Sequence, residues 1–207
     1  MSEALPPVGF VDTRQVRRNF ARAAAGYDDV AVLQREIGSR MLERLDYVKI
    51  EPQRVLDLGC GTGASLIALG ERYRDAQLLG ADFSEAMLGA VRARRSQLDW
   101  LLPFMRKRRA ALLAADAQAL PFGAGTIDLL WSNLALHWHP EPHRVFPEWH
   151  RVTCDEGLVM FSLFGPDTLR ELRAAFGEVD LDAHTLRFVD MHDIGDMLVH
   201  GGWSTPV

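Results

Sequence analysis

Residues 55–63 (VLDLGCGTG) place one carboxylate and three glycines where a chain could hold a nucleotide-like ligand. An apolar run leads to Asp57, glycines follow at Gly59, Gly61 and Gly63, and an amphipathic stretch begins at Ala64. Glycine lets the backbone bend sharply, and it lets a ligand approach without meeting a Cβ. This order predicts a buried strand, a tight turn and a helix, as in cofactor sites at the mouth of a parallel sheet.

The pattern of this loop leaves the cofactor open. Gly59-x-Gly61-x-x-Ala64, with Asp82 about 20 residues further on, satisfies the dinucleotide fingerprint in which an acid holds a ribose hydroxyl. NAD and S-adenosylmethionine therefore both fit. The agreement of loop, strand and downstream acid argues against a glycine turn that binds no ligand.

Hydrophobic periodicity and turn residues predict the elements that position this loop. Strands are expected at 54–58, 77–81, 111–114, 126–132 and 158–163. Helices are expected at 13–25 (capped by Asp12 or Thr13), 30–45, 64–73, 84–97, 142–153, 167–176 and 190–200. A basic, aromatic-bearing insert spans 100–109, and residues 155–157 read as a turn.

Because strands alternate with helices, we expect an α/β fold. It should be a doubly wound, Rossmann-like, mostly parallel sheet with helices on both faces. The whole chain, 1–207, is expected to form one domain, with 1–50 as an N-terminal helical segment. The closing residues 203–207 resemble a further strand, which suggests a fold lacking its final strands.

Composition narrows the class of protein. The net charge of −5 argues against a general nucleic-acid binder. Cys60 and Cys154 are the two cysteines, and Cys60 lies inside the glycine loop, so we expect free thiols and a cytoplasmic location. No export signal and no apolar run of the length of a membrane span is visible, so no membrane is expected.

Four motifs, in a fixed order along the chain, favour one of these two cofactors over the other. The glycine loop, Asp82 at the end of the second strand, residues 115–122 (ADAQALPF) and residues 128–133 (DLLWSN) resemble the class I S-adenosylmethionine-dependent methyltransferases. In that family the acid corresponding to Asp82 binds the ribose, and the one corresponding to Asp116 meets the adenine amino group. The resemblance implies S-adenosylmethionine as methyl donor. It implies these cofactor-binding residues: Asp57, Gly59, Gly61, Gly63, Asp82, Phe83, Asp116, Ala117 and Asn133.

A narrower resemblance rests on residues 18–28 (RNFARAAAGYD), 132–138 (SNLALHW) and 161–172 (FSLFGPDTLREL). These segments are similar to the malonyl-[acyl-carrier protein] O-methyltransferases of biotin synthesis. Those enzymes methylate the free carboxylate of a malonyl thioester. Such a carboxylate is already ionised at pH 7, so it needs no general base. It needs a cation or hydrogen-bond donors and a water-poor pocket.

Three residues are candidates for positioning the substrate. Arg187 could grip a carboxylate bidentately, and an arginine in a surface salt bridge is the alternative. Tyr27 could close over the cofactor, as the N-terminal segment does in the family it resembles, or merely pack the first helices. His137 follows the fourth strand with Trp138 and should line the pocket mouth, although a structural histidine also fits.

A histidine cluster and a basic run outside the glycine loop could also have a function. His137, His139 and His143 are interrupted by prolines and lack a completing acid or cysteine, so no metal site is expected. The basic run Arg106, Lys107, Arg108 and Arg109 could dock malonyl-acyl carrier protein by electrostatic steering. A solvated loop is the alternative.

Two other functions remain open beside malonyl-thioester methylation. The mitochondrial complex I assembly factor that hydroxylates an arginine shares much of this pattern, as do small-molecule methyltransferases. A cofactor-binding assembly protein that no longer catalyses is the third hypothesis. The acceptor pocket of this fold comes from variable loops, so the sequence predicts the methyl donor more firmly than the acceptor.

Overall fold

Five parallel strands form one sheet with the order β3-β2-β1-β4-β5. The computed structural model describes residues 11–101, 110–179, 185–186 and 188–206, and for 95–101 only the backbone path. The strands are β1 (Arg54–Leu58), β2 (Gln77–Asp82), β3 (Ala111–Ala114), β4 (Ile127–Asn133) and β5 (Thr153–Ser162). The expected doubly wound, Rossmann-like sheet is confirmed.

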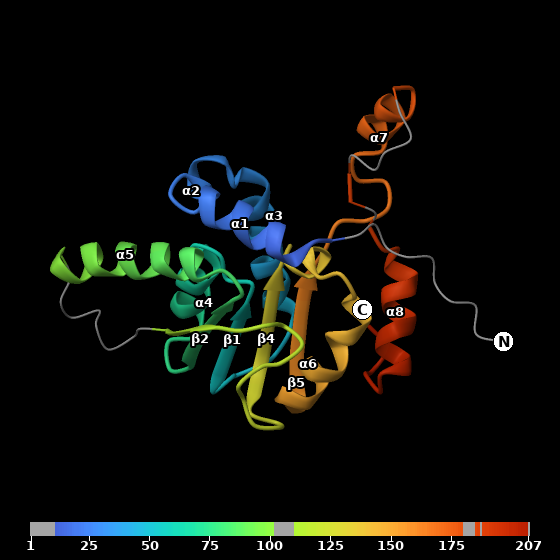
Figure 1. Cartoon of the computed structure of the whole chain (residues 1–207). Helices are drawn as coiled ribbons and strands as arrows, with labels where there is room; N and C mark the ends of the chain where they lie inside the picture. The colour runs from blue at the N-terminus through green and yellow to red at the C-terminus, as the bar shows by residue number, and fades with distance from the viewer. Residues whose placement is uncertain (1–10, 102–109, 180–184, 187, 207) are drawn as a thin grey trace.

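Helices cover both faces of the sheet and its carboxyl edge (Figure 1). They are α1 (Thr13–Ala23), α2 (Tyr27–Val30), α3 (Val32–Arg44), α4 (Ala64–Arg72), α5 (Glu85–Leu101), α6 (Phe146–Val152), α7 (Arg170–Gly177) and α8 (Met191–His200). Short 3₁₀ turns occupy Leu45–Tyr47, Leu136–Trp138 and Pro142–Arg144. In Figure 1, α1 and α2 lie above the ends at which the strand arrows point.

Alternation along the strands builds two separate cores. Val55 packs into a cluster with Leu66 of α4 and Leu88 of α5, whereas its neighbour Leu56 packs into a cluster with Trp149 of α6. Successive strand residues point to opposite faces, so one strand serves both cores. Apolar burial on both sides is what a parallel sheet requires.

Two expectations about the last third of the chain are wrong. The expected turn at 155–157 lies inside β5, where Glu156 has φ 64° and the register with β4 shifts. A bulge absorbs the turn residues without ending the strand. The expected strand near 203–207 is absent from residues 201–206, where Trp203 instead packs against the core beside α6 and α8.

Within the described ranges, the longest apolar stretches of helix are too short or too polar to cross a membrane.

Candidate functional site

The glycine loop after β1 is a tight turn held by the neighbouring strand. The amides of Gly59 and Cys60 both donate to the carbonyl oxygen of Ala81, at 2.8 and 3.0 Å. Gly59, Gly61 and Gly63 all have positive φ, at 76°, 51° and 85°. This left-handed region favours glycine, so the alternating glycines are needed for the path of the backbone.

The three glycines differ in what surrounds them. A Cβ on Gly61 would have nothing within 4 Å, so this position faces open space. A Cβ on Gly63 would lie 3.2 Å from Val91, and one on Gly59 would lie 2.3 Å from the Cβ of Ala135. Gly61 therefore leaves room for a ligand, while Gly59 and Gly63 allow protein packing.

Asp82, at the end of β2, binds the loop directly. Its carboxylate accepts the amide of Gly61 at 2.9 Å and the amide of Ser84 at 2.8 Å. Burial raises the pKa of Asp82, and these two hydrogen bonds oppose that rise. The carboxylate is thus fixed beside Gly61 at the floor of the site.

Asp57, on β1, is a buried carboxylate with one oxygen unpaired within the described chain. It is 1% exposed, and its Oδ2 has no hydrogen-bond partner among the described residues. Burial first, and then the negative charge of Asp82, raise the pKa of Asp57 to about 8. A buried oxygen without a partner is costly, so it points to a cationic or hydrogen-bond-donating ligand beside it.

Two cavities, of about 330 and 320 Å³, meet at the glycine loop. Tyr27, Gly59, Gly61 and Asn133 line both of them. The first cavity is also lined by residues expected to meet the nucleoside: Asp82, Phe83, Asp116 and Ala117. The second is also lined by Asp57 and by residues of α3 and α4. An elongated ligand with two chemically different ends fits such a pair.

Aromatic side chains of the N-terminal helices roof the first cavity. Phe20 of α1 meets Phe83 at 5.8 Å and Trp138 at 5.3 Å between ring centroids, both edge to face. Tyr27 lies 6.2 Å from Phe20, and burial and the charge of Asp82 raise the pKa of Tyr27. The phenol therefore stays protonated and can donate a hydrogen bond.

Asp116 lies at the rim of the same cavity, after β3. Its Oδ1 accepts the amide of Gln118 at 3.0 Å and lies 3.9 Å from Nε2 of His139. The Asp116 side chain is 63% exposed, which leaves its other oxygen accessible. It can therefore accept from an exocyclic amine that enters the cavity.

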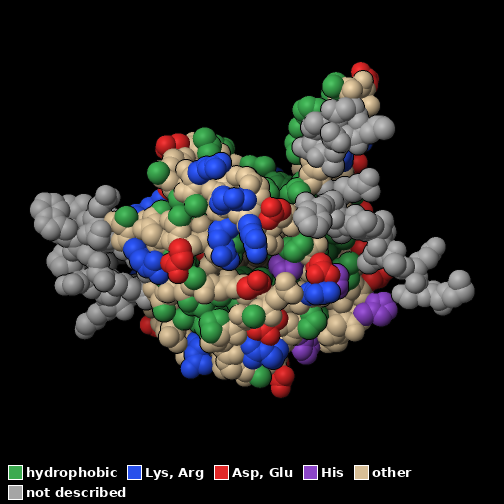
Figure 2. Space-filling model, viewed as in Figure 1, with side chains coloured by type: hydrophobic (Ala, Val, Ile, Leu, Met, Phe, Trp, Pro, Cys, Tyr) green, Lys and Arg blue, Asp and Glu red, His purple; other side chains and the backbone are tan. Residues whose placement is uncertain are grey.

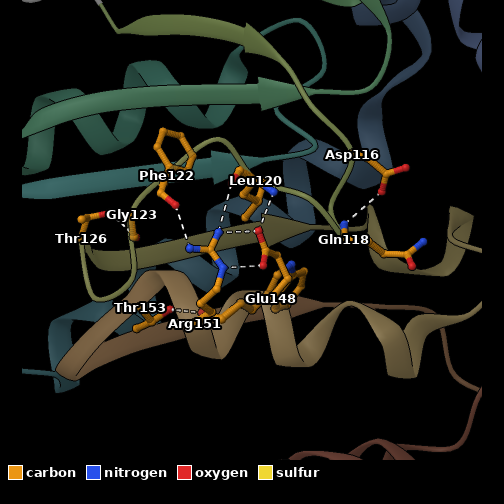
Figure 3. Close-up of polar contacts among 10 residues, drawn as sticks. Asp116, Gln118, Leu120, Phe122, Gly123, Thr126, Glu148, Arg151 and Thr153 are labelled. Atoms are coloured by element: carbon orange, nitrogen blue, oxygen red, sulfur yellow. Dashed lines mark hydrogen bonds and ion pairs between the residues drawn. The ribbon is translucent and has the colours of Figure 1, made fainter.

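A polar clamp on α6 holds the loop that carries Asp116 (Figure 3). Glu148 accepts the amide of Leu120 at 2.6 Å, and Arg151 binds both Glu148 oxygens at 2.7 Å. Arg151 also donates to the carbonyls of Leu120 and Phe122, at 3.1 and 2.9 Å. The loop after β3 is thus fastened to α6 by side-chain contacts to its backbone.

Asn133 links the end of β4 to α3 and β5. Its Nδ2 donates to the carbonyl of Gln34 at 2.8 Å, and its Oδ1 accepts the Ser162 hydroxyl at 2.8 Å. A Cβ on Gly38 would lie 3.1 Å from the same Nδ2, so α3 approaches closely. Asn133 therefore shapes the boundary between the two cavities.

His137 lies beside the main cavity, not on its wall. Its ring packs against Phe164 at 4.7 Å, Trp138 at 5.1 Å and Phe188 at 5.8 Å. Burial lowers the pKa of His137 to about 4, and its Nδ1 has no partner among the described residues. Of the two residues expected at the pocket mouth, Trp138 lines the first cavity and His137 does not.

Some expected residues fall outside the described ranges. Arg187 and the basic run Arg106, Lys107, Arg108 and Arg109 belong to the parts of the chain that the structure does not describe. Among described residues, no group of three or more His, Cys, Asp or Glu is placed to hold a metal ion.

Sequence reasoning missed the contribution of α1. Thr13, Arg17 and Phe20 line the first cavity. Phe20 lies one helical turn after Val16, a spacing that is typical of an ordinary apolar helix face and does not indicate a ligand site. The segment that carries it, residues 18–28, was itself part of the narrower resemblance, and this was the signal available.

The chain resembles known proteins throughout most of its length. A family model described as "Methyltransferase domain" matches residues 56–161, about half of the chain. A malonyl-[acyl-carrier protein] O-methyltransferase from Methylovorus sp. is 49% identical over 95% of this chain and 66% of its own length. Proteins of the same name from Gallionella capsiferriformans and Nitrosospira multiformis are 48% and 47% identical, covering 95% and 96% of this chain. The chain spans about two thirds of the length of these relatives.

Solved structures agree on the fold. A putative methyltransferase of Haloferax volcanii in complex with the activator Trm112 has a TM-score of 0.69 at 20% identity. That match covers 92% of this chain and 76% of the other chain. A [4+2]-cyclase has the same TM-score at 19% identity, covering 97% of this chain and 75% of its own. A cyclase on this fold illustrates that the fold alone does not fix the reaction.

Proposed function

This chain belongs to the malonyl-[acyl-carrier protein] O-methyltransferases, within the methyltransferase domain family, and from that premise we propose its reaction. The methyl group of S-adenosylmethionine is transferred to the free carboxylate of a malonyl thioester on a carrier protein, as in biotin synthesis. When bound, S-adenosylmethionine supplies an electrophilic methyl group on a sulfonium. The carboxylate oxygen gains that methyl, and the carbon–sulfur bond breaks to leave a neutral ester and a neutral thioether.

The residues of the two cavities suit this cofactor. Unpartnered Oδ2 of Asp57 provides a site for the ammonium group of the methionine end. Asp82 offers a carboxylate to the ribose hydroxyls, and Asp116 accepts from the adenine amine. Gly61, with open space above it, lets the cofactor pass between the two cavities. The unpartnered oxygen of Asp57 beside this opening is the observation that carries the proposal.

Protein groups act on this reaction mainly by position and by exclusion of water. The reacting charges neutralise each other, so an apolar surrounding favours their approach. Phe20, Phe83 and Trp138 provide that surrounding at the first cavity. Tyr27, protonated, donates a hydrogen bond toward the cofactor or the malonyl carboxylate. No proton has to be removed from the substrate, because the carboxylate is ionised at neutral pH.

Arg187 is proposed to orient the malonyl carboxylate through its guanidinium. His137 is proposed as a positioning residue, because its ring packs on Trp138 of the cavity wall and on Phe188. The run Arg106–Arg109 stays a candidate contact for the carrier protein. We propose that the reaction takes place in the cytoplasm, whose reducing conditions would keep Cys60 and Cys154 from forming disulfides.

Transfer of a labelled methyl group tests the proposal. The protein is incubated with labelled S-adenosylmethionine and malonyl-carrier protein, and the methyl ester is detected by mass spectrometry. Acetyl-carrier protein is the matched control, because it lacks the free carboxylate and should receive no label. Arg187→Ala should reduce transfer and Arg187→Lys should retain part of it. No ester on malonyl-carrier protein in the unmutated sample overturns the proposal.

A further inference from the structure

Helix α1 carries an unusual concentration of positive charge. Its 11 residues include Arg14, Arg17, Arg18 and Arg22 and no acidic residue. The whole chain has a net charge of −5, so the charge of α1 is opposite in sign to that of the chain as a whole. Arg14, Arg18 and Arg22 are spaced four apart and share one side of the helix, away from Val16 and Phe20. All three are exposed.

Carboxylates do not neutralise this face. None of the four arginines forms an ion pair with any residue that the structure describes. Arginines of other elements do: Arg40 pairs with Glu36 at 2.8 Å and Arg72 with Asp46 at 2.6 Å. Like charges one turn apart destabilise a helix. A helix that keeps three of them in a row, unpaired, points to an external partner of opposite charge.

The basic face borders the entrance of the first cavity. Arg17 and Thr13 line that cavity, and the Arg17 guanidinium carbon lies 5.9 Å from the centroid of the Phe83 ring. Arg14 and Arg18 flank Arg17 on the helix surface. Figure 2 shows blue side chains gathered over the part of the molecule where Figure 1 places α1 and its neighbours. A partner bound to this face would therefore stand beside the opening.

We propose that the exposed arginine face of α1, formed by Arg14, Arg18 and Arg22, docks an acidic surface of the carrier protein that delivers the malonyl thioester. This inference rests on the proposed function and adds the docking surface to it. Guanidinium groups bind carboxylates bidentately, and an uncompensated basic patch speeds the encounter with an acidic partner. The partner's thioester arm can then enter the cavity past Arg17 while the carrier stays outside.

Charge reversal on this face tests the proposal against a small substrate. Arg18→Glu and Arg22→Glu, singly and together, are assayed with malonyl-carrier protein and with malonyl-pantetheine, which has no carrier and no phosphate. For the carrier substrate, each single change should raise KM severalfold and the double change at least about tenfold, with kcat unchanged. KM for malonyl-pantetheine should not change. Added salt should raise KM of the unmutated protein for the carrier and reduce the difference between the variants.

Arg74→Glu is the matched control, because Arg74 is exposed in the turn between α4 and β2 and its side chain donates to the backbone carbonyl of Glu71 at 3.4 Å. It should leave KM unchanged for both substrates. An equal rise of KM for the two substrates overturns the docking proposal, and so does no rise for either.

Failure of the proposed function gives a different result. If the unmutated protein methylates neither substrate, the reaction is wrong, and docking is then judged by fluorescence anisotropy with labelled malonyl-carrier protein. Binding that is lost in R18E/R22E and kept in R74E supports the docking surface. No binding by the unmutated protein, or equal binding by all variants, overturns it.

Discussion

The hydroxyl of Thr62 in the glycine loop donates a hydrogen bond to Oδ1 of Asp28 at 2.5 Å. The other carboxylate oxygen of Asp28 pairs with Arg94 of α5, and Arg35 donates to the Asp28 carbonyl. One residue thus fastens the N-terminal helices to the loop and to α5. Tyr27, which lines both cavities, directly precedes it.

Asp28→Ala should weaken cofactor binding. The variant loses both side-chain contacts that fasten the helical cover, and a charge-assisted hydrogen bond contributes about 1.5–3 kcal/mol when well buried. Asp28 is 40% exposed, so we expect a smaller effect, a rise of about three- to tenfold in the Kd for S-adenosylmethionine. Calorimetric titration measures it. Asp29→Ala, in the exposed next residue, is the control, and equal Kd values for the two variants would contradict this role.

Gly59→Ala should lower the free energy of unfolding by about 2 kcal/mol or more. A left-handed alanine costs about 1–2 kcal/mol, and overpacking adds about 1–3 kcal/mol. Both apply here, since φ is 76° and the new Cβ would lie 2.3 Å from that of Ala135. Gly89→Ala in α5, with nothing within 4 Å, should instead stabilise by about 0.5–1 kcal/mol. Urea unfolding of both variants measures these free energies, and similar free energies of unfolding for the two variants would contradict the prediction.

Asp57→Asn should change how stability depends on pH. The pKa of Asp57 is raised from 3.8 to about 8 in the folded protein. Between these values the unfolded chain has lost the proton that the folded protein keeps, so rising pH favours unfolding. This destabilisation is absent below about pH 4 and complete above about pH 8. Relative to Asp57→Asn, the unmutated protein should therefore lose stability across that window in urea titrations. Parallel pH curves would show that Asp57 titrates normally.

His137→Phe should flatten the loss of stability in acid. The pKa of His137 is lowered from 6.5 to about 4 by burial. As pH falls through that range, the unfolded chain binds a proton that the folded protein does not, so unfolding is favoured. Phenylalanine fits among Trp138, Phe164 and Phe188 and removes this proton. Thermal unfolding between pH 4 and 7 measures the difference, with the exposed His143→Phe as control. If His137→Phe loses as much stability between pH 7 and pH 4 as the unmutated protein, the His137 ring does not stay neutral in the folded protein.

The carboxyl edge of the sheet could be predicted from the sequence because strand periodicity and turn chemistry are local. The strands that carry Asp57, Asp82 and Asn133 lie within one residue of where the pattern placed them. Glycines at 59, 61 and 63 could be recognised for the same reason. Which glycine faces open space could not, because that depends on Ala135 and Val91, which are distant in the sequence.

Where the structure differs from the elements predicted by the sequence pattern, tertiary packing is the reason. The bulge at Glu156 keeps residues 155–157 inside β5, because pairing with β4 outweighs their preference for a turn. Residues 203–207 resemble a strand in the sequence, yet the amide of Trp203 donates to the carbonyl of Leu198 and its ring joins the core. The position of α1 over the first cavity likewise depends on contacts between residues distant in the sequence, those of Phe20 with Phe83 and Trp138.

The parallel sheet has a practical consequence for anyone who purifies this protein. Asp57, Asp82, Asp116 and Asn133 belong to different strand ends, and β1 pairs with β4 across more than seventy residues of intervening chain. Asp57 and Asp82 meet within one local β–α–β unit, but Asn133 joins them only after the long intervening segment has closed, so the complete set of four requires the whole sheet. The fraction of a preparation that binds cofactor is therefore a count of natively folded molecules. Excess cofactor should also raise the free energy of unfolding of those molecules, with the logarithm of its concentration once that concentration exceeds the Kd.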